Sequence, residues 1–463
     1  MIRLFKVSVP GSVVTLLISE VTLLFCCYLA GVYWSVDEPQ FVLFSEDGIW
    51  GVSLVVLTVV LGMYFGDMYE DYRIPSRVAL VQQFCMVIGV AFLVQAICNY
   101  GRWGALLMNK WAMVYGSGLA LVAGPAWRIL FATLMSRAVR PRKLLFLGSS
   151  PVVGEVIGQL FESPQFGLAP IGFLDNDASA PPKLSGSPRL GAISDLAKVV
   201  TANRPDSIIV GMAERRGNLP VEELLHLRLS GIHVEDAALI YQNVFRRVST
   251  RDLRPSELIF SAELGPKPQK IALQSAYSFL VALVALAVLT PLIVIIAIIV
   301  KLTSPGPAFY RQTRVGFNGE HFTLYKFRSM SANAEDETGP AWATKDDPRI
   351  TPVGRWLRKL RIDEFPQLFN VLRGEMSIVG PRPERPEFVA VLEEKIPYYR
   401  LRHSVKPGIT GWAQINHKYG DTIEDTIIKL EFDLYYIKNM ALSLDAFIIF
   451  HTAKTMLLAR GSQ

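Results

Sequence analysis

Two adjacent carboxylates, Asp363 and Glu364, lie in the cation-rich run RWLRKLRIDEFPQLFNVLRGEMSIVGPRPE. In such a pair, one side chain can attack phosphorus while the other holds a hard divalent cation. Neighbouring arginines can bind the phosphate oxygens, which otherwise repel both carboxylates. The pattern therefore indicates phosphate chemistry, and the rest of the chain must position the pair and provide a surface for its substrate.

Four basic residues near the pair are candidates for phosphate binding. Lys326 and Arg328 alternate along the predicted strand in TLYKFRSM, which places both on one face. Arg358 lies shortly before the pair, and Arg382 stands between two prolines that present its guanidinium stiffly. The alternatives are a solvated basic strand for the first two residues and a surface ion pair with Glu384 for Arg382.

The position of Pro366 predicts a helix that begins at Asp363 or just after it, because proline is tolerated in a first helical turn. The helix runs through QLFNVLR and ends at Gly374. The carboxylate pair then lies at a helix N-terminus, where the peptide dipoles, Arg358 and Arg361 favour ionised side chains. We expect Asp363 to be an anion at neutral pH; the alternative is that it only caps the helix.

The composition indicates a chain with both membrane and soluble parts. Of its 463 residues, 51% are apolar and 19% are charged, which is too apolar for a wholly soluble protein and too charged for a bare membrane bundle. The net charge of +6 is spread along the chain without a basic-aromatic array. Anionic headgroups or phosphorylated substrates are therefore expected partners, and nucleic acid is not. The four cysteines lie in apolar stretches without disulfide or zinc spacing.

Residues 1–138 are predicted to form a four-helix transmembrane domain. Its apolar segments are residues 11–33, 49–66, 78–98 and 111–135. Each is long enough for the ~20 residues that a bilayer requires. Basic residues precede the first segment and follow the fourth, whereas the loop at 34–48 carries acidic residues and no cation. This charge bias predicts that both ends of the domain face the cytoplasm.

Residues 139–262 are predicted to form a Rossmann-like α/β domain. The string LLFLGSSPVVGEVIGQL is typical of a buried strand, a glycine turn and a helix, and further strands are expected at 171–174 and 207–210. A dinucleotide fingerprint needs three glycines, whereas only Gly148 and Gly154 are present, with Ser150 at the middle position. We therefore expect a structural or regulatory role rather than an NAD site.

Residues 263–310 contain a fifth apolar segment, at 277–302, which is also long enough to span a bilayer. Basic residues flank it on both sides, which favours keeping both ends on one side of the membrane. Thr290 and Pro291 lie at its middle, where proline removes a backbone hydrogen bond and kinks a helix. We predict a re-entrant hairpin that dips into one leaflet; the alternative is a kinked spanning helix.

Four ordered stretches beyond this segment resemble the polyprenyl-phosphate glycosyl-1-phosphate transferases, bacterial enzymes that move a sugar 1-phosphate from a nucleotide diphosphate sugar to a polyprenyl phosphate. The stretches are SPGPAFYRQTRVGFNGEHFTLYKFRSM, DDPRITPVGRWLRKLRIDEFPQL, MSIVGPRPERPEF and HSVKPGITGWAQIN. The resemblance of the catalytic part begins near Ala272. The preceding spans and α/β unit resemble the long members, which start capsule, O-antigen or exopolysaccharide repeat units.

The resemblance implies a role for several residues. Asp363 corresponds to the nucleophile and Glu364 to a magnesium ligand. Arg358 corresponds to a basic residue before the pair, and Arg382 to the centre of a Pro-Arg-Pro motif. Thr290 and Pro291 correspond to the helix-breaking pair of the re-entrant segment, where serine is more familiar than threonine.

The resemblance also implies the architecture and the partners. It implies a mainly helical cytoplasmic catalytic domain at 311–463, Mg²⁺ as cofactor, and a covalent sugar-phosphoryl-aspartate intermediate. The expected substrates are undecaprenyl phosphate and a UDP-sugar, with glucose or galactose as the sugar. The expected location is the bacterial inner membrane, in contact with its lipids, and the expected assembly is a homodimer.

Two features of the C-terminal part carry separate expectations. Residues 440–460 mix apolar and polar side chains in a pattern typical of an interfacial amphipathic helix rather than a span. Trp412 either packs in the protein or stacks on the uracil of the substrate.

Two other functions fit the sequence less well. An NAD-dependent nucleotide-sugar-modifying enzyme needs an intact glycine fingerprint and a Tyr-x-x-x-Lys pair, but Tyr241 is followed by Phe245 at the lysine position. A non-catalytic membrane scaffold for polysaccharide assembly is disfavoured by the intact Asp363–Glu364 pair.

Overall fold

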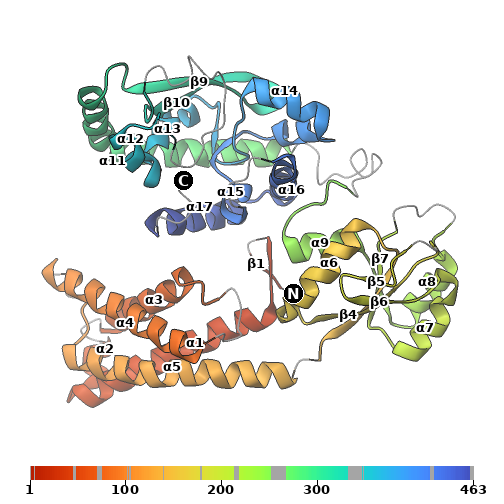
Figure 1. The fold of residues 1–463 in the computed structure, drawn as a ribbon. Helices are drawn as coiled ribbons and strands as arrows, with labels where there is room; N and C mark the ends of the chain where they lie inside the picture. Colours follow the sequence, from red (N-terminus) through yellow and green to blue (C-terminus); the bar gives the residue numbers. More distant parts are fainter. Residues whose placement is uncertain are drawn as a thin grey trace.

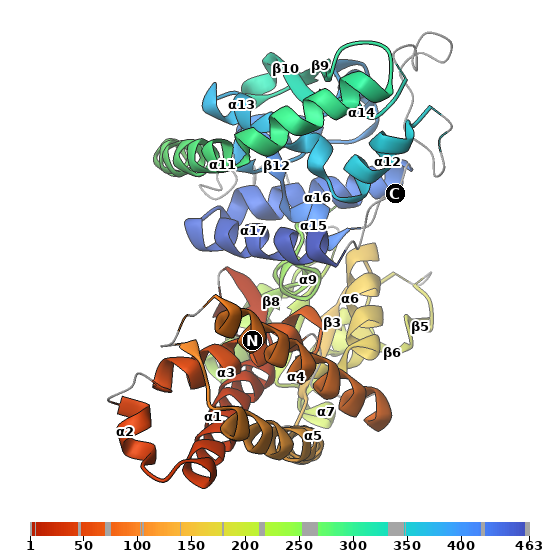
Figure 2. The same cartoon turned by 90° about the vertical axis from the view of Figure 1, so that its left-hand side faces the viewer.

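The structure is a computed structural model that describes residues 2–4, 6–44, 48–69, 76–101, 103, 106–138, 140–177, 180–212, 218–251, 267–331, 347, 349–417 and 422–458. This part of the chain comprises an N-terminal helix bundle, an α/β domain, and a C-terminal domain that lies against both (Figure 1). Figure 2 shows the same arrangement from the side. Among the described residues, five helices are long and apolar enough to cross a membrane.

The N-terminal bundle contains the four long helices that the apolar segments predicted. They are α1 (Gly11–Ser35), α3 (Gly48–Phe65), α4 (Arg77–Tyr100) and α5 (Lys110–Ala138), with a short α2 (Pro39–Phe44) between the first two. Helices α1 and α5 approach closely because Gly31 and Gly116 face the partner helix: a Cβ on Gly31 would lie 2.5 Å from Ala112 O, and one on Gly116 would clash with Tyr28. Small residues commonly permit such close packing between membrane helices.

A buried ion pair crosses the bundle between α1 and α5. Arg128 NH2 donates to Glu20 Oε2 at 3.0 Å, and both side chains are almost completely buried. Arg128 NH1 also donates to Met68 O at 2.8 Å. The guanidinium therefore holds the segment that follows α3 against the other two helices.

Removing Arg128 should destabilise the bundle strongly, because Glu20 would then lie buried without its cation. We expect Arg128→Met to lower the free energy of unfolding by about 3–5 kcal/mol. Glu20→Leu combined with Arg128→Met should unfold at a temperature much closer to that of the unmodified chain. Thermal unfolding of the purified protein in detergent measures both, and equal losses in the single and double variants would contradict this account.

The α/β domain is built on a six-stranded sheet whose order is β5-β6-β4-β3-β7-β8. The strands are β3 (Arg142–Leu147), β4 (Leu168–Leu174), β5 (Lys183–Leu184), β6 (Ser187–Gly191), β7 (Ser207–Val210) and β8 (His233–Asp236). All neighbouring pairs are parallel except β5 with β6. The strands expected at 171–174 and 207–210 are confirmed, and the order of the parallel strands is the one typical of doubly wound sheets.

Helices cover both faces of this sheet. They are α6 (Pro151–Glu162) and α9 (Ala237–Phe245) on one face, and α7 (Leu196–Asn203) and α8 (Val221–Leu229) on the other. Strand β3 is buried from Leu144 to Leu147, because alternate side chains enter the two cores. This agrees with the continuous apolar run that a two-sided parallel sheet requires.

The C-terminal domain is mainly helical, with two small two-stranded sheets. Its helices are α11 (Pro268–Thr303), α12 (Pro352–Lys359), α13 (Gln367–Leu372), α14 (Pro386–Lys395), α15 (Trp412–Asn416), α16 (Ile423–Asn439) and α17 (Leu442–Leu457). The antiparallel hairpin consists of β9 (Phe309–Val315) and β10 (His321–Phe327), and the parallel pair of β11 (Ser377–Val379) and β12 (Gly408–Thr410). One hydrophobic core joins these elements to α11.

Helix α11 continues through Thr290 and Pro291 instead of breaking there. It nevertheless bends near its middle, so that its two arms run in different directions (Figures 1 and 2). Proline explains the bend, since it removes one intrahelical bond, while Thr290 Oγ1 donates to Leu286 O at 2.6 Å. Both ends are held by the C-terminal domain: Lys270 Nζ donates to Met440 O at 2.9 Å at the first end, and Arg328 donates to carbonyls at the second.

Helix α17 lies between the C-terminal domain and the bundle. Leu444 and Ile448 are fully buried in the core of the C-terminal domain rather than left free for lipid, as an interfacial helix alone would leave them. Lys454 reaches the end of α3, where its Nζ donates to Tyr64 O at 3.0 Å and pairs with Asp67. A helix within 440–460 is confirmed, and it joins two domains, whereas its interfacial position stays a prediction.

The C-terminal domain also contacts the α/β domain through a buried carboxylate. Glu431 on α16 is 3% exposed and accepts hydrogen bonds from Tyr241 Oη at 2.8 Å and Thr250 N at 3.0 Å. Arg247 Nε lies 3.2 Å from the same side chain. The segment that follows α9 is therefore fixed to α16 by charged and backbone groups.

Candidate active site

The adjacent carboxylates lie in a short 3₁₀ turn, Ile362–Glu364, between α12 and α13. Arg361 enters this turn with φ of +54°, a left-handed conformation that reverses the chain after α12. Helix α13 begins only at Gln367, with Pro366 before it, so the predicted helix start at Asp363 or just after was too early. Gly374 ends the segment with φ of +78°, as the sequence predicted. The helix has only six residues, so its dipole contributes less at the carboxylates than a long helix would.

Glu364 is held by two cations from different parts of the domain. Lys326 on β10 places Nζ 3.0 Å from Glu364 Oε1, and Arg382 places NH2 2.8 Å from the same oxygen. Burial alone would raise the pKa of Glu364, but Arg382 and Lys326 lower it well below its ordinary value. Glu364 is therefore a fixed anion.

Asp363 differs from its neighbour. Among the described residues, no hydrogen bond to the Asp363 carboxylate is found, and the residue is 8% exposed. Burial raises the pKa of Asp363; Lys326 and Arg358 counteract this effect, and the charge on Glu364 adds to it. Arg358 favours the anion, as expected, but burial outweighs the nearby cations and the net effect is to raise this pKa. Ionisation of Asp363 at neutral pH stays a prediction.

The raised pKa of Asp363 leads to a prediction about pH. Because Lys326 lowers this pKa, Lys326→Met should raise it further, so that a reaction requiring ionised Asp363 loses rate at a higher pH than in the unmodified protein. The acid limb of the pH profile of kcat/KM measures this shift. Lys359→Met, which removes one exposed charge from α12, should leave the limb in place. A limb unchanged or moved to lower pH in Lys326→Met would contradict the assignment.

The sequence of this chain is similar to those of known proteins. Residues 269–459 match the bacterial sugar transferase family. The chain is 39% identical over 310 residues, 66% of this chain and 70% of the relative, to the UDP-N-acetylgalactosamine-undecaprenyl-phosphate N-acetylgalactosaminephosphotransferase of Aeromonas hydrophila. It is 33% identical over 427 residues, 90% of this chain and 84% of the relative, to the UDP-glucose:undecaprenyl-phosphate glucose-1-phosphate transferase of Xanthomonas campestris pv. campestris.

The chain belongs to the polyprenyl-phosphate glycosyl-1-phosphate transferases. A third relative, the exopolysaccharide production protein PSS of Rhizobium leguminosarum bv. phaseoli, is 41% identical over 196 residues. The match covers 98% of that relative but 41% of this chain. More than half of this chain therefore has no counterpart in that relative.

The other two predicted basic residues of the transferase occupy different positions. Arg358 on α12 lies near enough to Asp363 to lower its pKa, and its Nε donates to Ser329 Oγ at 2.9 Å. Arg328 is 5% exposed and donates to Ser304 O at 2.8 Å and Pro305 O at 2.6 Å, at the end of α11. Strand β10 ends at Phe327, so the alternation that would have placed Arg328 beside Lys326 stops before it.

Arg328 therefore links α11 to the active site. Carbonyl groups in the last turn of a helix lack intrahelical donors, and a guanidinium can satisfy several of them. The second arm of α11 also packs against Phe327 and Leu357, with Ile362 beside them. Helix α11 and the turn that carries the carboxylates thus share one small core.

Asn370 is a buried residue of the site that sequence reasoning missed. It is 0% exposed; its Nδ2 donates to Thr323 O at 2.6 Å, and its Oδ1 accepts from Tyr325 N at 3.2 Å. These bonds fix α13 to β10 and so hold Lys326 opposite Glu364. The available signal was a lone amide within the apolar run QLFNVL.

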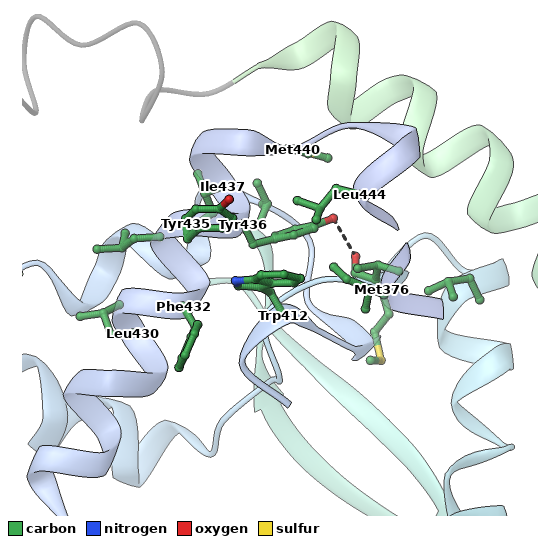
Figure 3. Close-up of a cluster of buried hydrophobic side chains, with 14 of the residues drawn as sticks. Met376, Trp412, Leu430, Phe432, Tyr435, Tyr436, Ile437, Met440 and Leu444 are labelled. Carbon is green, nitrogen blue, oxygen red and sulfur yellow. Dashed lines mark hydrogen bonds between the residues drawn. The ribbon is translucent and has the colours of Figure 1, made fainter. Parts of the chain in front are cut away.

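Trp412 packs in the core, which decides between its two expected roles. It is 1% exposed, and its ring stacks on Tyr435 with centroids 5.5 Å apart. Figure 3 shows it enclosed by side chains from α16 and α17, including Tyr436 and Leu444. Its Nε1 donates to Arg246 O at 2.9 Å, so stacking on a uracil is ruled out in this arrangement.

The donor set at Asp363 and Glu364 suits magnesium. Both side chains offer hard carboxylate oxygens, and Mg²⁺ commonly uses one or two carboxylates together with waters and substrate phosphates. Within the described residues, no group of three or more His, Cys, Asp or Glu side chains could hold a metal alone. A metal at Glu364 would have coordination positions open to substrate phosphate and water.

Proposed function

We propose that the transferase moves a hexose 1-phosphate from a UDP-sugar to undecaprenyl phosphate and releases UMP. The observation that carries the proposal is the asymmetry of the pair: Glu364 is fixed by Lys326 and Arg382, whereas the adjacent Asp363 carboxylate is left without a hydrogen-bond donor among the described residues. A nucleophile must be near its cations but free to form a bond. The names of the relatives support the substrate class.

The reaction proceeds in two displacements at one phosphorus. An oxygen of Asp363 forms a bond to the phosphorus that bears the sugar, and the bond from that phosphorus to the bridging oxygen breaks, so that UMP leaves. An oxygen of the lipid phosphate then forms a bond to the same phosphorus, and the bond to Asp363 breaks, which restores the carboxylate. One phosphoanhydride replaces another, and no external proton or electron is needed.

The basic side chains offset the charge that repels a carboxylate from a diphosphate. Lys326 and Arg382 hold Glu364 and can also meet phosphate oxygens, since Arg382 is one-third exposed. Arg358 lies near Asp363 from α12. When bound, Mg²⁺ supplies further neutralisation of the phosphate oxygens, with Glu364 as its ligand. Together these cations account for much of the barrier reduction.

We further propose that α11 is re-entrant and that the catalytic domain lies on the cytoplasmic face of the inner membrane. Support comes from the bend at Pro291 and from the attachment of both ends of α11 to one domain. Large apolar side chains along both arms are exposed; they include Val284, Val288, Ile295 and Ile298. Their exposure suits contact with acyl chains.

The orientation can be tested by cysteine labelling in intact cells. In a variant without its four cysteines, Arg400→Cys on the catalytic domain should react with a membrane-impermeant maleimide only after the inner membrane is opened. Asp37→Cys, in the loop after α1, should react from outside. Labelling of residue 400 in intact cells would overturn the orientation.

The α/β domain is proposed to be structural or regulatory. Ser150 is buried, and its Oγ accepts from Val153 N at 3.4 Å at the start of α6, where a dinucleotide fold binds pyrophosphate. A Cβ on Gly148 would lie 2.8 Å from Met212 Cα, so the turn is also packed against the neighbouring loop. These contacts favour this role over an NAD site.

The test of the reaction is to incubate the purified protein with magnesium, undecaprenyl phosphate and a panel of UDP-sugars. We expect UMP release with one preferred sugar; glucose or galactose was expected from the sequence, and the relatives act on N-acetylgalactosamine or glucose by their names. Release of UDP instead would mean transfer of the sugar alone and would refute the proposal. The product would begin an exopolysaccharide, capsule or O-antigen repeat unit.

A further inference from the structure

The backbone of the Pro-Arg-Pro segment is held at every carbonyl group. Pro381 O accepts from Gly408 N at 3.0 Å, Arg382 O from Arg402 NH2 at 2.9 Å, and Pro383 O from Arg314 NH1 at 3.0 Å. The two prolines have no N–H and fixed φ angles, so this segment has little freedom of its own. The backbone of Arg382 is therefore rigidly held, and its side chain extends from a fixed position.

Arg402 belongs to a buried ion pair. Its side chain is 7% exposed and that of Asp433 is 2% exposed. Arg402 Nε and NH2 donate to Asp433 Oδ2 at 3.1 and 2.9 Å, and NH1 donates to Tyr399 Oη at 2.8 Å. Asp433 lies on α16, so the pair ties the Pro-Arg-Pro segment to a long helix of the domain core.

The contacts continue directly to the reacting pair. The side chain of Arg382 donates to Glu364 Oε1 at 2.8 Å, while its own carbonyl is held by Arg402. Within the described part of the chain, no hydrogen bond or ion pair joins Arg402 or Asp433 to Asp363 or Glu364; both act through Arg382. A charged side chain in a catalytic site depends on the groups behind it for its position.

We propose that the Arg402–Asp433 pair is a positioning element for phosphoryl transfer, which fixes the backbone of Arg382 so that its guanidinium meets both Glu364 and a phosphate oxygen. The proposal rests on the function proposed above. The competing view is that the pair only stabilises the fold. Loss of a positioning element lowers the rate in a folded protein, whereas loss of a purely structural pair lowers stability first.

The test uses an apolar replacement of the whole pair, Arg402→Met with Asp433→Leu. Removing Arg402 alone would leave Asp433 buried without its cation, but removing both often preserves stability. We expect the double variant to unfold near the temperature of the unmodified protein, with kcat for UMP release lowered about 10- to 100-fold. Arg400→Met, which removes an exposed arginine paired with Glu393, should not change kcat.

A thermodynamic cycle with Arg382 separates positioning from general damage. In an Arg382→Ala background, the same double replacement should add less than about a twofold further loss, since the group to be positioned is already absent. Losses that multiply fully would overturn the proposal. Arg402→Lys in the otherwise unmodified chain should keep more of the rate of UMP release than Arg402→Met does, because lysine can still donate to Arg382 O.

Hydrogen exchange provides a readout that does not depend on activity. The peptide that contains residues 380–385 should exchange faster in the double variant than in the unmodified protein. An unchanged exchange rate of this peptide would refute the positioning role of the Arg402–Asp433 pair, even if the rate of UMP release fell. A failure of the unmodified protein to release UMP would instead refute the proposed function and leave the exchange result to decide the positioning role.

Discussion

Asp363→Asn is expected to lower UMP release at least about a thousandfold, because the neutral amide keeps the shape of the side chain but lacks the anionic carboxylate oxygen that attacks phosphorus. Glu364, Lys326 and Arg382 keep their mutual contacts, so the substrate should still bind. The measurement is the rate of UMP release under saturating UDP-sugar. Asp425→Asn, the same change on the surface of α16, serves as the matched control and should retain full activity.

The covalent intermediate gives a second observable for Asp363. Incubating the unmodified protein with a UDP-sugar labelled in the sugar, without lipid acceptor, should leave label on the denatured chain at the peptide that contains Asp363. Hydroxylamine should release this label, since an acyl phosphate reacts with it. Full turnover by Asp363→Asn would refute the assignment of Asp363 as nucleophile, and absence of label in the unmodified protein would exclude the two-displacement route.

Glu364→Gln should lower kcat by about 100-fold, because Lys326 and Arg382 lose the anion that fixes both of them. If Glu364 is also the metal ligand, the Mg²⁺ concentration for half-maximal rate should rise at least about tenfold. A titration of the initial rate with Mg²⁺ measures both effects.

Lys326→Met is the comparison that separates the two roles of Glu364. It removes one cation from the carboxylate but no metal ligand, so it should lower the rate without raising the Mg²⁺ requirement. An unchanged requirement in Glu364→Gln would refute the metal assignment even where activity is lost. An equal rise in the Mg²⁺ requirement of Glu364→Gln and Lys326→Met would show that Lys326 and Arg382, rather than the Glu364 carboxylate, control metal binding.

Local sequence patterns predicted most of the elements. The apolar runs at 11–33 and 111–135 correspond to helices, because span length is a property of a continuous segment. The strand at 207–210 was predicted equally well from its apolar run. Gly374 correctly predicted the end of the segment after the carboxylates, since it acts through its own backbone, whereas the helix start predicted from Pro366 was too early.

Features that depend on distant partners were not predictable in this way. Arg328 was expected beside Lys326, but the strand ends one residue too early and the free carbonyls of α11 lie within reach. The pKa of Asp363 depends on how deeply the fold buries it, which no spacing reveals. The contact of Lys454 with Tyr64 joins positions that only the tertiary structure brings together.

The buried carboxylate of Glu431 bears on how such a chain can change during evolution. Tyr241 and Thr250 of the α/β domain donate to it, and Trp412 donates in the opposite direction to Arg246. A lineage that gains or sheds the α/β domain must therefore also replace polar groups inside the catalytic domain. Fusion of the α/β domain to a catalytic domain therefore changes buried residues as well as chain length. Grafting the α/β domain onto a homologue that lacks it should require matched substitutions on the helix that corresponds to α16.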